Sequence, residues 1–449
     1  MEVHTIYSTL EFLPPEIWGY IFTFLKDYEL VLVNTCWYFR LILSNKYYGW
    51  AHKKKFVDYL AINGYFKVLK WAHEEKFPFG STTCAAAASG GHLQVLQWIK
   101  KMGCPWNSET CAAAARSGHL EVLDWAQKSG CPCDYKICAN AALGGHQHVL
   151  QWAIANHCHT NFSVCANAVL GGHLNIFKWA VENNFIMDAQ TCANAALRGY
   201  FDLLIWARDK QCPWDAKTCA NAAKAGRLDI LQWARKHDCP WDERTCYGAV
   251  ENGNLEILIW AITNDCPWHN WMMVVAGQNG HLHIIQWLRE HNMPWHNMLG
   301  YHTAKAGHLH VLKWAVSNGY QPDSWILSGA AKGGHYDIIK WGLEIGIKPG
   351  VWCCVMAAKQ GNLSLLKWLR DNDFPWNETV SAEAARSGHL NILKWLQSNG
   401  CTWGWYTTYN ASIAGHLDVV KWVRQQGCPE IAPYFLAQEW SVNDNSKVT

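Results

Sequence analysis

Residues 215–242 read DAKTCANAAKAGRLDILQWARKHDCPWD, and this stretch determines the fold. An alanine-rich segment, 216–225, precedes Gly226, a residue that tolerates the left-handed conformation in which helices commonly end. Leu, Ile, Leu, Trp and Ala then follow at helical spacing. Asp215 can cap the first helix, because its carboxylate can accept the free amide protons of the first turn. The stretch therefore predicts two short helices and a tight turn, after which Cys-Pro-Trp-Asp at 239–242 starts the next unit.

The same unit recurs every 27 residues without an insertion. Each copy carries a glycine at the position of Gly226 and a tryptophan seven residues later. The repeat glycines are Gly64, Gly91, Gly118, Gly145, Gly172, Gly199, Gly226, Gly253, Gly280, Gly307, Gly334, Gly361, Gly388 and Gly415. A fixed period of this length is typical of stacked repeats. The sequence has no segments in which β-branched residues alternate with polar ones, so β-strands, and hence a propeller, are not expected. Because one unit buries too little apolar surface to fold alone, we expect one all-α helical solenoid of about fourteen units.

The composition restricts the class of protein. Hydrophobic residues make up 50% and charged residues 16%, which excludes disorder except at the ends. The 38 Lys and Arg against 36 Asp and Glu leave a net charge of +2, so we expect no nucleic-acid partner. There is no apolar stretch long enough to span a membrane and no secretory signal after Met1. We therefore expect a cytoplasmic protein with reduced cysteines and no membrane partner.

The segment GHLEVL at 118–123, together with the alanine-rich first helix, resembles an ankyrin repeat. The resemblance extends over roughly residues 51–428. Two features differ: the period is 27 instead of about 33, and Thr110-Cys111-Ala112 replaces the Thr-Pro-Leu-His signature. The resemblance implies paired helices and a concave target-binding face, but no projecting hairpin finger. Units with Cys-Pro-Trp-Asp are also similar to those expanded in large DNA viruses of amoebae, which would place the chain in a host cytoplasm.

The segment before the repeats is of a different kind. Residues 13–25, LPPEIWGYIFTFL, and 29–40, ELVLVNTCWYFR, resemble an F-box. This resemblance implies binding to the small adaptor subunit of a cullin–RING ubiquitin ligase. The implied contacts are Leu13, Pro14, Glu16, Ile17, Ile21, Phe22, Leu25 and Leu30. The alternative is that these helices only cap the solenoid, because terminal repeats need a covering element.

The expected domains follow from these boundaries. They are an N-terminal arm at 1–10, an F-box-like helical domain at 11–50, the repeats at 51–440 and a disordered tail at 441–449.

The cysteines suggest metal ligands until they are placed on the repeat. All but Cys36, Cys133 and Cys353 of the 19 fall in two columns of constant phase, as small packing residues do. The column that contains His119 is expected to satisfy backbone groups between helices. His157 and His159 leave adventitious zinc or nickel binding as an alternative. No nucleophile–base pattern or phosphate-binding loop occurs, so we expect no metal, no cofactor and no enzyme.

The first helix of each unit has two faces. Counted back from the repeat glycine, positions −7, −4 and −3 share the core side, whereas −9, −5 and −2 lie opposite. In later repeats −9 carries mainly aromatic residues and −2 carries Lys or Arg. The predicted target-binding residues are Trp271, Trp325, Trp352, Tyr406, Lys305, Lys332, Lys359 and Arg386. An aromatic ring beside a cation suits an acidic, partly apolar target. The alternative is that the rings pack beneath the neighbouring turn.

The middle repeats differ at the same positions. Position −5 is a row of asparagines that is either solvated or available to an extended chain: Asn140, Asn167, Asn194 and Asn221. Position −2 there is apolar: Leu143, Leu170 and Leu197.

Together these features predict a monomeric adaptor that recruits target proteins to an F-box type ubiquitin ligase. The alternatives are a stand-alone repeat scaffold or inhibitor, and a metal or redox protein.

Overall fold

The computed structural model describes residues 50–158 and 163–429, which contain 28 helices and no β-strand. This confirms the predicted all-α repeat architecture. No helix in these ranges is long and apolar enough to cross a membrane. The F-box-like residues, Cys36 and His159 lie outside the described residues.

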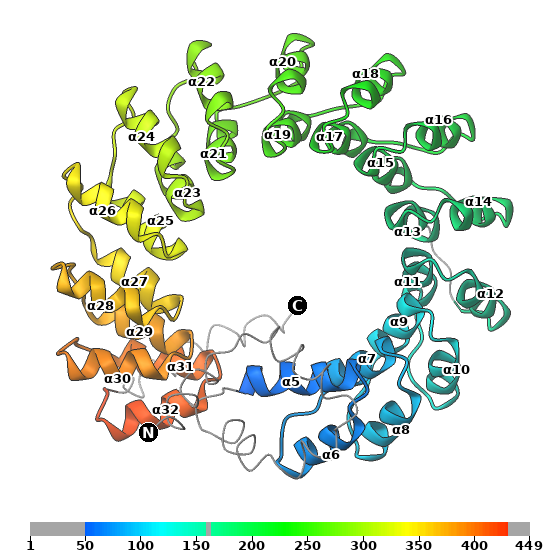
Figure 1. Ribbon diagram of the computed structural model, residues 1–449, viewed down its shortest axis with the longest axis horizontal. Coiled ribbons are helices and arrows are strands. Elements are labelled where there is room, and N and C mark those ends of the chain that lie inside the picture. The colour runs from blue at the N-terminus through cyan, green and yellow to red at the C-terminus, as the bar shows by residue number, and fades with distance from the viewer. Residues whose placement is uncertain (1–49, 159–162, 430–449) are drawn as a thin grey trace, which may run out of the picture. The chain divides into compact units, whose positions relative to one another are not determined.

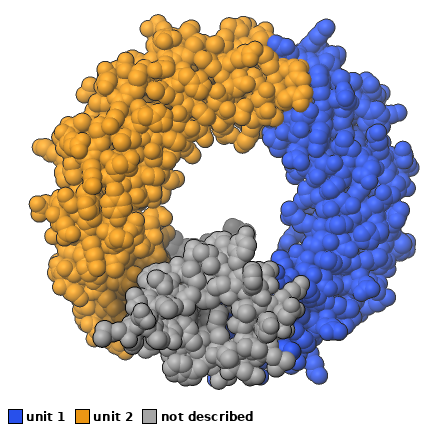
Figure 2. All heavy atoms as spheres, viewed as in Figure 1, with its two compact units in different colours: residues 1–221, 232–239 blue, residues 222–231, 240–449 orange. Residues whose placement is uncertain are grey.

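The contacts between residues divide the chain into two units, coloured separately in Figure 2. The first unit comprises residues 1–221 and 232–239, and the second comprises 222–231 and 240–449. The helices of the first unit are α5 (Trp50–Ile62), α6 (Phe66–Glu74), α7 (Ser81–Ser89), α8 (Leu93–Lys101), α9 (Ser108–Ser117), α10 (Leu120–Lys128), α11 (Lys136–Gly144), α12 (Gln147–Ala155), α13 (Ser163–Gly171), α14 (Leu174–Glu182), α15 (Ala189–Arg198) and α16 (Phe201–Asp209). Helices α17 (Ala216–Lys224) and α18 (Leu228–Lys236) each have residues in both units.

The second unit contains seven complete helix pairs. They are α19 (Glu243–Glu251), α20 (Leu255–Thr263), α21 (Trp271–Gln278), α22 (Leu282–Glu290), α23 (Leu299–Ala306), α24 (Leu309–Ser317), α25 (Ser324–Gly333), α26 (Tyr336–Glu344), α27 (Val351–Lys359), α28 (Leu363–Asp371), α29 (Glu378–Arg386), α30 (Leu390–Ser398), α31 (Trp405–Ile413) and α32 (Leu417–Gln425).

Within each unit the helices form two rows. The odd-numbered helices lie side by side on the concave side, and the even-numbered helices form the outer row (Figure 1). From α5 to α15 and from α19 to α31, each odd-numbered helix packs on the next odd-numbered helix, and each also packs on the even-numbered helix that follows it. The first helix of every repeat therefore carries the concave surface of its unit.

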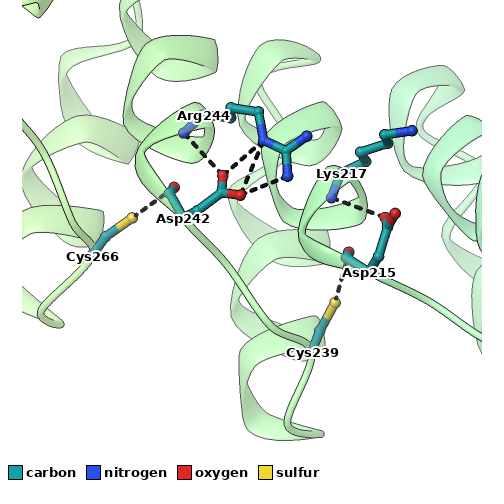
Figure 3. Close-up of polar contacts among 6 residues, drawn as sticks. All are labelled: Asp215, Lys217, Cys239, Asp242, Arg244 and Cys266. Carbon is teal, nitrogen blue, oxygen red and sulfur yellow. Dashed lines mark hydrogen bonds and ion pairs between the residues drawn. The ribbon is translucent and has the colours of Figure 1, made fainter. Parts of the chain in front are cut away.

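The loop between repeats is held at both ends, as Figure 3 shows for two copies. Asp215 Oδ1 accepts a hydrogen bond of 3.0 Å from the Lys217 amide, which confirms the predicted N-cap. The Asp215 carbonyl accepts a contact of 3.6 Å from Cys239 Sγ. Asp242 repeats both interactions in the second unit, with Cys266 as the thiol donor. The thiols of the second cysteine column, at the end of each repeat, thus donate hydrogen bonds to the residue that caps the first helix of the same repeat.

Histidine and glycine are paired across successive repeats. His119 Nε2 lies 3.0 Å from the carbonyl oxygen of Ser89 in the preceding repeat. Gly91 has φ of +73°, and a Cβ there would lie 2.6 Å from the His119 ring. The histidine column therefore satisfies backbone carbonyls between repeats, as predicted, and the glycine leaves room for its ring.

The first cysteine column belongs to the core. Cys84, Cys138 and Cys165 are fully buried between first helices. Burial raises the pKa of Cys138 to about 12, so this thiol stays protonated at neutral pH. Every cysteine in the described ranges is a free thiol. The packing role predicted for this column is confirmed.

Candidate binding surface

The structure describes the predicted target-binding residues but not the predicted ligase-adaptor contacts. The ligase-adaptor contacts lie outside the described residues: Leu13, Pro14, Glu16, Ile17, Ile21, Phe22, Leu25 and Leu30. The predicted target-binding residues all belong to the first helices of the second unit.

The predicted target-binding rings lie in the first turn of α21, α25, α27 and α31. Their exposed fractions are 36% for Trp271, 47% for Trp325, 48% for Trp352 and 49% for Tyr406. Other large apolar side chains of the described residues are exposed too, such as Ile186 and Leu417. The four rings, together with Met298 at 36%, instead recur at one repeat position, and such a set of exposed apolar groups is typical of an interaction surface.

Several of these rings touch one another across repeats. Trp325 and Trp352 lie nearly parallel, with their centroids 6.3 Å apart. Tyr301 meets Trp325 edge-on at 6.2 Å, and His302 meets Trp271 edge-on at 5.7 Å. We call Trp271, His302, Tyr301, Trp325 and Trp352 the aromatic row. The rings therefore pack sideways on each other while their outer surfaces remain open.

Two members of the aromatic row were not predicted from the sequence. Tyr301 and His302 stand at positions −6 and −5, where other repeats carry residues such as Ala and Asn. They adjoin each other at 5.3 Å and fill the gap between Trp271 and Trp325, because position −9 of their own repeat holds Met298. The row stops before α29, where position −9 is Thr379. Tyr406 instead stacks on its neighbour Trp405 at 3.6 Å.

The four predicted cations differ in charge compensation. Lys359 Nζ lies 3.1 Å from a carboxylate oxygen of Glu383, and Arg386 lies 3.8 Å from the same side chain. Lys305 and Lys332 have no carboxylate within 4.0 Å among the described residues. Charge on this face is therefore concentrated at the step from α23 to α25.

The imidazole of His302 lies close to these two free cations. Burial lowers the pKa of His302, and the positive charges of Lys305 and Lys332 lower it further. Lys332 Nζ also lies 6.0 Å from the centroid of the Tyr301 ring. His302 is accordingly neutral at pH 7, and the local positive charge comes from the two ammonium groups.

Two glycines allow α23 and α25 to approach closely. A Cβ at Gly329 would lie 2.3 Å from the carbonyl oxygen of Tyr301, so no other residue fits there without movement of a helix. A Cβ at Gly300 would lie 2.8 Å from the Tyr320 hydroxyl, which accepts a 3.0 Å hydrogen bond from the Gly300 amide. This close contact brings Trp325 and Lys332 beside the rings of α23.

The asparagine row of the first unit corrects the assignment of position −5 as an outward face. Asn194 is only 4% exposed, and its Nδ2 donates a 2.7 Å hydrogen bond to the Ala166 carbonyl. Asn221 bonds Ala193 in the same way at 2.9 Å, whereas Asn140 bonds the Lys136 carbonyl of its own helix. Successive first helices approach closely enough for this side chain to reach the preceding repeat. Half of the row is therefore used in repeat-to-repeat hydrogen bonds.

The second unit also has an open hollow of about 440 Å³ at its first repeats. It is lined by Lys224, Glu251, Asn252, Val275, Gln278 and Asn279. Lys224 and Glu251 form an ion pair of 2.8 Å across it, so its wall is nearly neutral. Within 50–158 and 163–429, no group of three or more His, Cys, Asp or Glu is arranged to hold a metal ion.

Comparison with known proteins gives a local family match. Residues 354–397 match the family model for ankyrin repeats (many copies). No curated protein matches the chain. The family match and the helical-repeat fold indicate a scaffold for protein–protein interaction. Helical-repeat folds are typical of binding proteins without enzymatic activity.

Solved structures of other helical-repeat proteins are similar in plan. The pentatricopeptide repeat protein PPR10 in complex with an 18-nucleotide psaJ RNA element has 10% identity and a TM-score of 0.34, over 96% of this chain and 74% of that chain. PPR10 from maize has 11% identity and a TM-score of 0.27, over 96% and 94%. Such values describe a shared repeat plan and nothing of what this chain binds.

The expectation that nucleic acid is excluded as a partner is wrong. Two similar solved structures hold RNA, so a helical-repeat chain gives no ground for excluding it. A net charge of +2 also gives no ground for exclusion, because it conceals local concentrations of charge. Lys305 and Lys332 provide such a concentration beside exposed rings.

Proposed function

We propose that this protein is a repeat scaffold that holds a target protein against the aromatic row and the adjoining cations of its second unit. One observation carries the proposal: Trp271, Trp325 and Trp352 remain 36–48% exposed on one face, next to two uncompensated lysines. Aromatic side chains with this exposure are enriched at the centres of protein interfaces, where they contribute much of the binding free energy.

The chemistry of this face defines the expected target. Rings supply apolar contact area, while Lys305 and Lys332 favour negative charge. The target segment is therefore acidic and partly apolar. It lies along the first helices, because the aromatic row extends from α21 to α27.

The test compares target capture by variants of the full chain. Trp325→Ala with Trp352→Ala removes the largest exposed rings and is expected to weaken capture at least about a hundredfold, with little dependence on salt. Asn140→Ala with Asn167→Ala, on the concave side of the first unit, is the matched control and should capture normally. Capture that survives the tryptophan changes but is lost with the asparagine changes would show that the target binds the first unit.

We propose further that the protein connects its target to a ubiquitin ligase. The support for this link is the sequence pattern at 13–25 and 29–40, which resembles an F-box. We place the activity in the cytoplasm, and in that of a host cell if the chain is viral. Changing Leu13, Pro14 and Ile17 together to Ala should abolish co-purification of the ligase adaptor while the repeats keep their helical circular dichroism.

The second candidate function is a stand-alone scaffold or inhibitor. It is favoured by the family match, which lies in the repeats at 354–397. Undiminished adaptor binding by the triple variant, or no adaptor binding by the parent chain, would favour this second function.

A further inference from the structure

The free positive charge of the second unit is confined to one step of the repeat. At position −2, Lys305 and Lys332 are successive members of the column, and neither has an ion-pair partner among the described residues. The column has no unpaired ammonium group on either side, with Gln278 before them and Lys359 paired to Glu383 after them. The two lysines are carried by α23 and α25, which pack directly on each other, and the axes of packed helices lie ~8–10 Å apart.

Aromatic side chains that carry hydrogen-bonding groups lie near these two lysines. His302 and Tyr301 lie on α23 with Lys305, and Trp325 lies on α25 with Lys332. Tyr301 contacts both His302 and Trp325, at 5.3 and 6.2 Å. Because Gly329 lets α25 press on the backbone of α23, the cations and rings of the two helices converge on one place. The Tyr301 hydroxyl and the His302 imidazole add neutral hydrogen-bonding groups.

We propose that Lys305, Lys332, His302 and Tyr301 bind one compact dianion, the phosphoryl group of a phosphorylated serine or threonine in the target segment. The flanking Trp325 and Trp352 then hold apolar side chains of the same segment. Phosphorylation of the target thereby controls its capture. This inference rests on the proposed function and specifies the chemistry of that surface.

The distribution of charge favours a single dianion over an extended polyanion. A phosphoryl group carries close to two negative charges at pH 7 and has three strong acceptor oxygens, which matches two ammonium groups. A chain with negative charge at every step would meet the carboxylate of Glu383 two repeats beyond α25, and that of Glu251 two repeats before α23. Lys224 is already paired with Glu251, and Glu383 lies against both Lys359 and Arg386. The site therefore suits one doubly charged group between neighbours whose cations already contact carboxylates.

The test uses fluorescein-labelled peptide pools and the full chain, with binding measured by fluorescence anisotropy. Each pool has random positions around a fixed Leu-Trp pair and a central residue that is phosphoserine, aspartate or serine. The phosphoserine pool is expected to bind at least about tenfold more tightly than the serine pool and more tightly than the aspartate pool. Lys305→Gln with Lys332→Gln should remove this preference.

The matched control is Lys224→Gln, which changes a paired lysine in the same column. It is expected to keep the phosphoserine preference within about twofold. Equal binding of the phosphoserine and aspartate pools would overturn the inference in favour of a carboxylate site. Tighter binding of a labelled 18-nucleotide single-stranded RNA, lost in the double lysine variant, would overturn it in favour of nucleic acid.

The outcomes also separate this inference from the proposed function. If all three pools bind equally and Trp325→Ala with Trp352→Ala abolishes their binding, the target surface stands and the phosphoryl site is wrong. If no pool binds the parent chain, the inference is overturned. Circular dichroism and thermal unfolding of each variant show whether a loss of binding is due to misfolding.

Discussion

In the first unit, Asn194 and Asn221 stand five residues before the repeat glycine, and each donates a hydrogen bond to a carbonyl of the preceding repeat. In the second unit, Asn410 makes the same kind of bond to Ala382, but two earlier repeats hold His302 and Gly329 at this position. Rings and cations remain exposed beside them, whereas Asn194 is buried. One repeat position therefore either joins neighbouring repeats or shapes a surface for a partner. A polar side chain that reaches a backbone carbonyl is no longer available to a ligand.

The exact period makes this contrast informative. The repeats have the same 27-residue length in both units, and the second-column cysteines Cys212 and Cys266 bond equivalent carbonyls 24 residues back in the first and second units. Equivalent positions of the two units can therefore be compared residue by residue.

The largest effect is expected at the contact between α23 and α25. Gly329→Ala places a methyl group 2.3 Å from the Tyr301 carbonyl oxygen, so the helices must separate. We expect a loss of about 2–3 kcal/mol in the free energy of unfolding. Gly350→Ala is the control, because its Cβ would meet only Ser324 Cβ, at 3.9 Å. Urea unfolding followed by circular dichroism measures both, and equal midpoints for the two variants would contradict the close packing.

A smaller loss is expected in the asparagine row. Asn194→Ala removes a buried hydrogen bond of 2.7 Å to the Ala166 carbonyl and should cost about 1–2 kcal/mol. Asn140→Ala removes only a bond within its own helix and should cost less than about 0.5 kcal/mol. Hydrogen exchange of the α13 and α15 amides reports the difference locally. Similar effects of both changes would mean that the row is solvated throughout.

The histidine column should make both units sensitive to acid. Burial lowers the pKa of His92 and His146 in the first unit and of His308 and His389 in the second. The folded protein therefore binds fewer protons than the unfolded chain just below the unfolded pKa of about 6.5. Stability is complete above that pH and falls as pH decreases through it. Thermal unfolding at pH 7.5 and pH 5 measures the loss.

The control for this prediction exists in the sequence. Asn254 and Asn362 occupy the histidine position in two repeats, and each caps its helix through a hydrogen bond of 3.0 Å. His308→Asn should thus keep the repeat folded and reduce the loss on acidification. A protein that becomes more stable between pH 7.5 and pH 5 would show that these imidazoles do not govern the pH dependence.

The smallest effect is a gain at the second turn of the repeat. Asp238 has φ of +61°, a conformation that costs most residues free energy, whereas six other repeats have glycine at this turn position. Asp238→Gly and Asp265→Gly should each stabilise the protein by about 0.5–1 kcal/mol. Gln232→Gly, in the middle of α18, should be destabilising by a similar amount. A decrease in melting temperature for Asp238→Gly would contradict the assignment of strain.

The sequence predicted the repeat features that depend on local chemistry. The period, the Asp215 cap, the histidine bonds and the buried cysteines all follow from residue types at fixed positions. The burial of Asn194 could not be predicted, because it depends on the distance between two helices. Likewise, Lys359 and Glu383 stand at different positions of neighbouring repeats, so only their packing shows that they pair.

The aromatic row was predicted in part. Trp271, Trp325 and Trp352 were found because they share one column, whereas Tyr301 and His302 break the pattern and join the row through contacts across repeats. A departure from the repeat consensus at Leu299–His302, where other first helices have Cys and Ala, was the only feature of the sequence that marked this place.

The most direct test of the central claim is site-specific photo-crosslinking to the captured target. A photoreactive phenylalanine analogue replaces Trp325 or Trp352 in the second unit, and Asn140 or Asn167 in the first. The account predicts that the target crosslinks at positions 325 and 352 and not at 140 or 167, because only the former rings face an unoccupied surface of their unit. Crosslinks at 140 and 167 without any at 325 and 352 would contradict it.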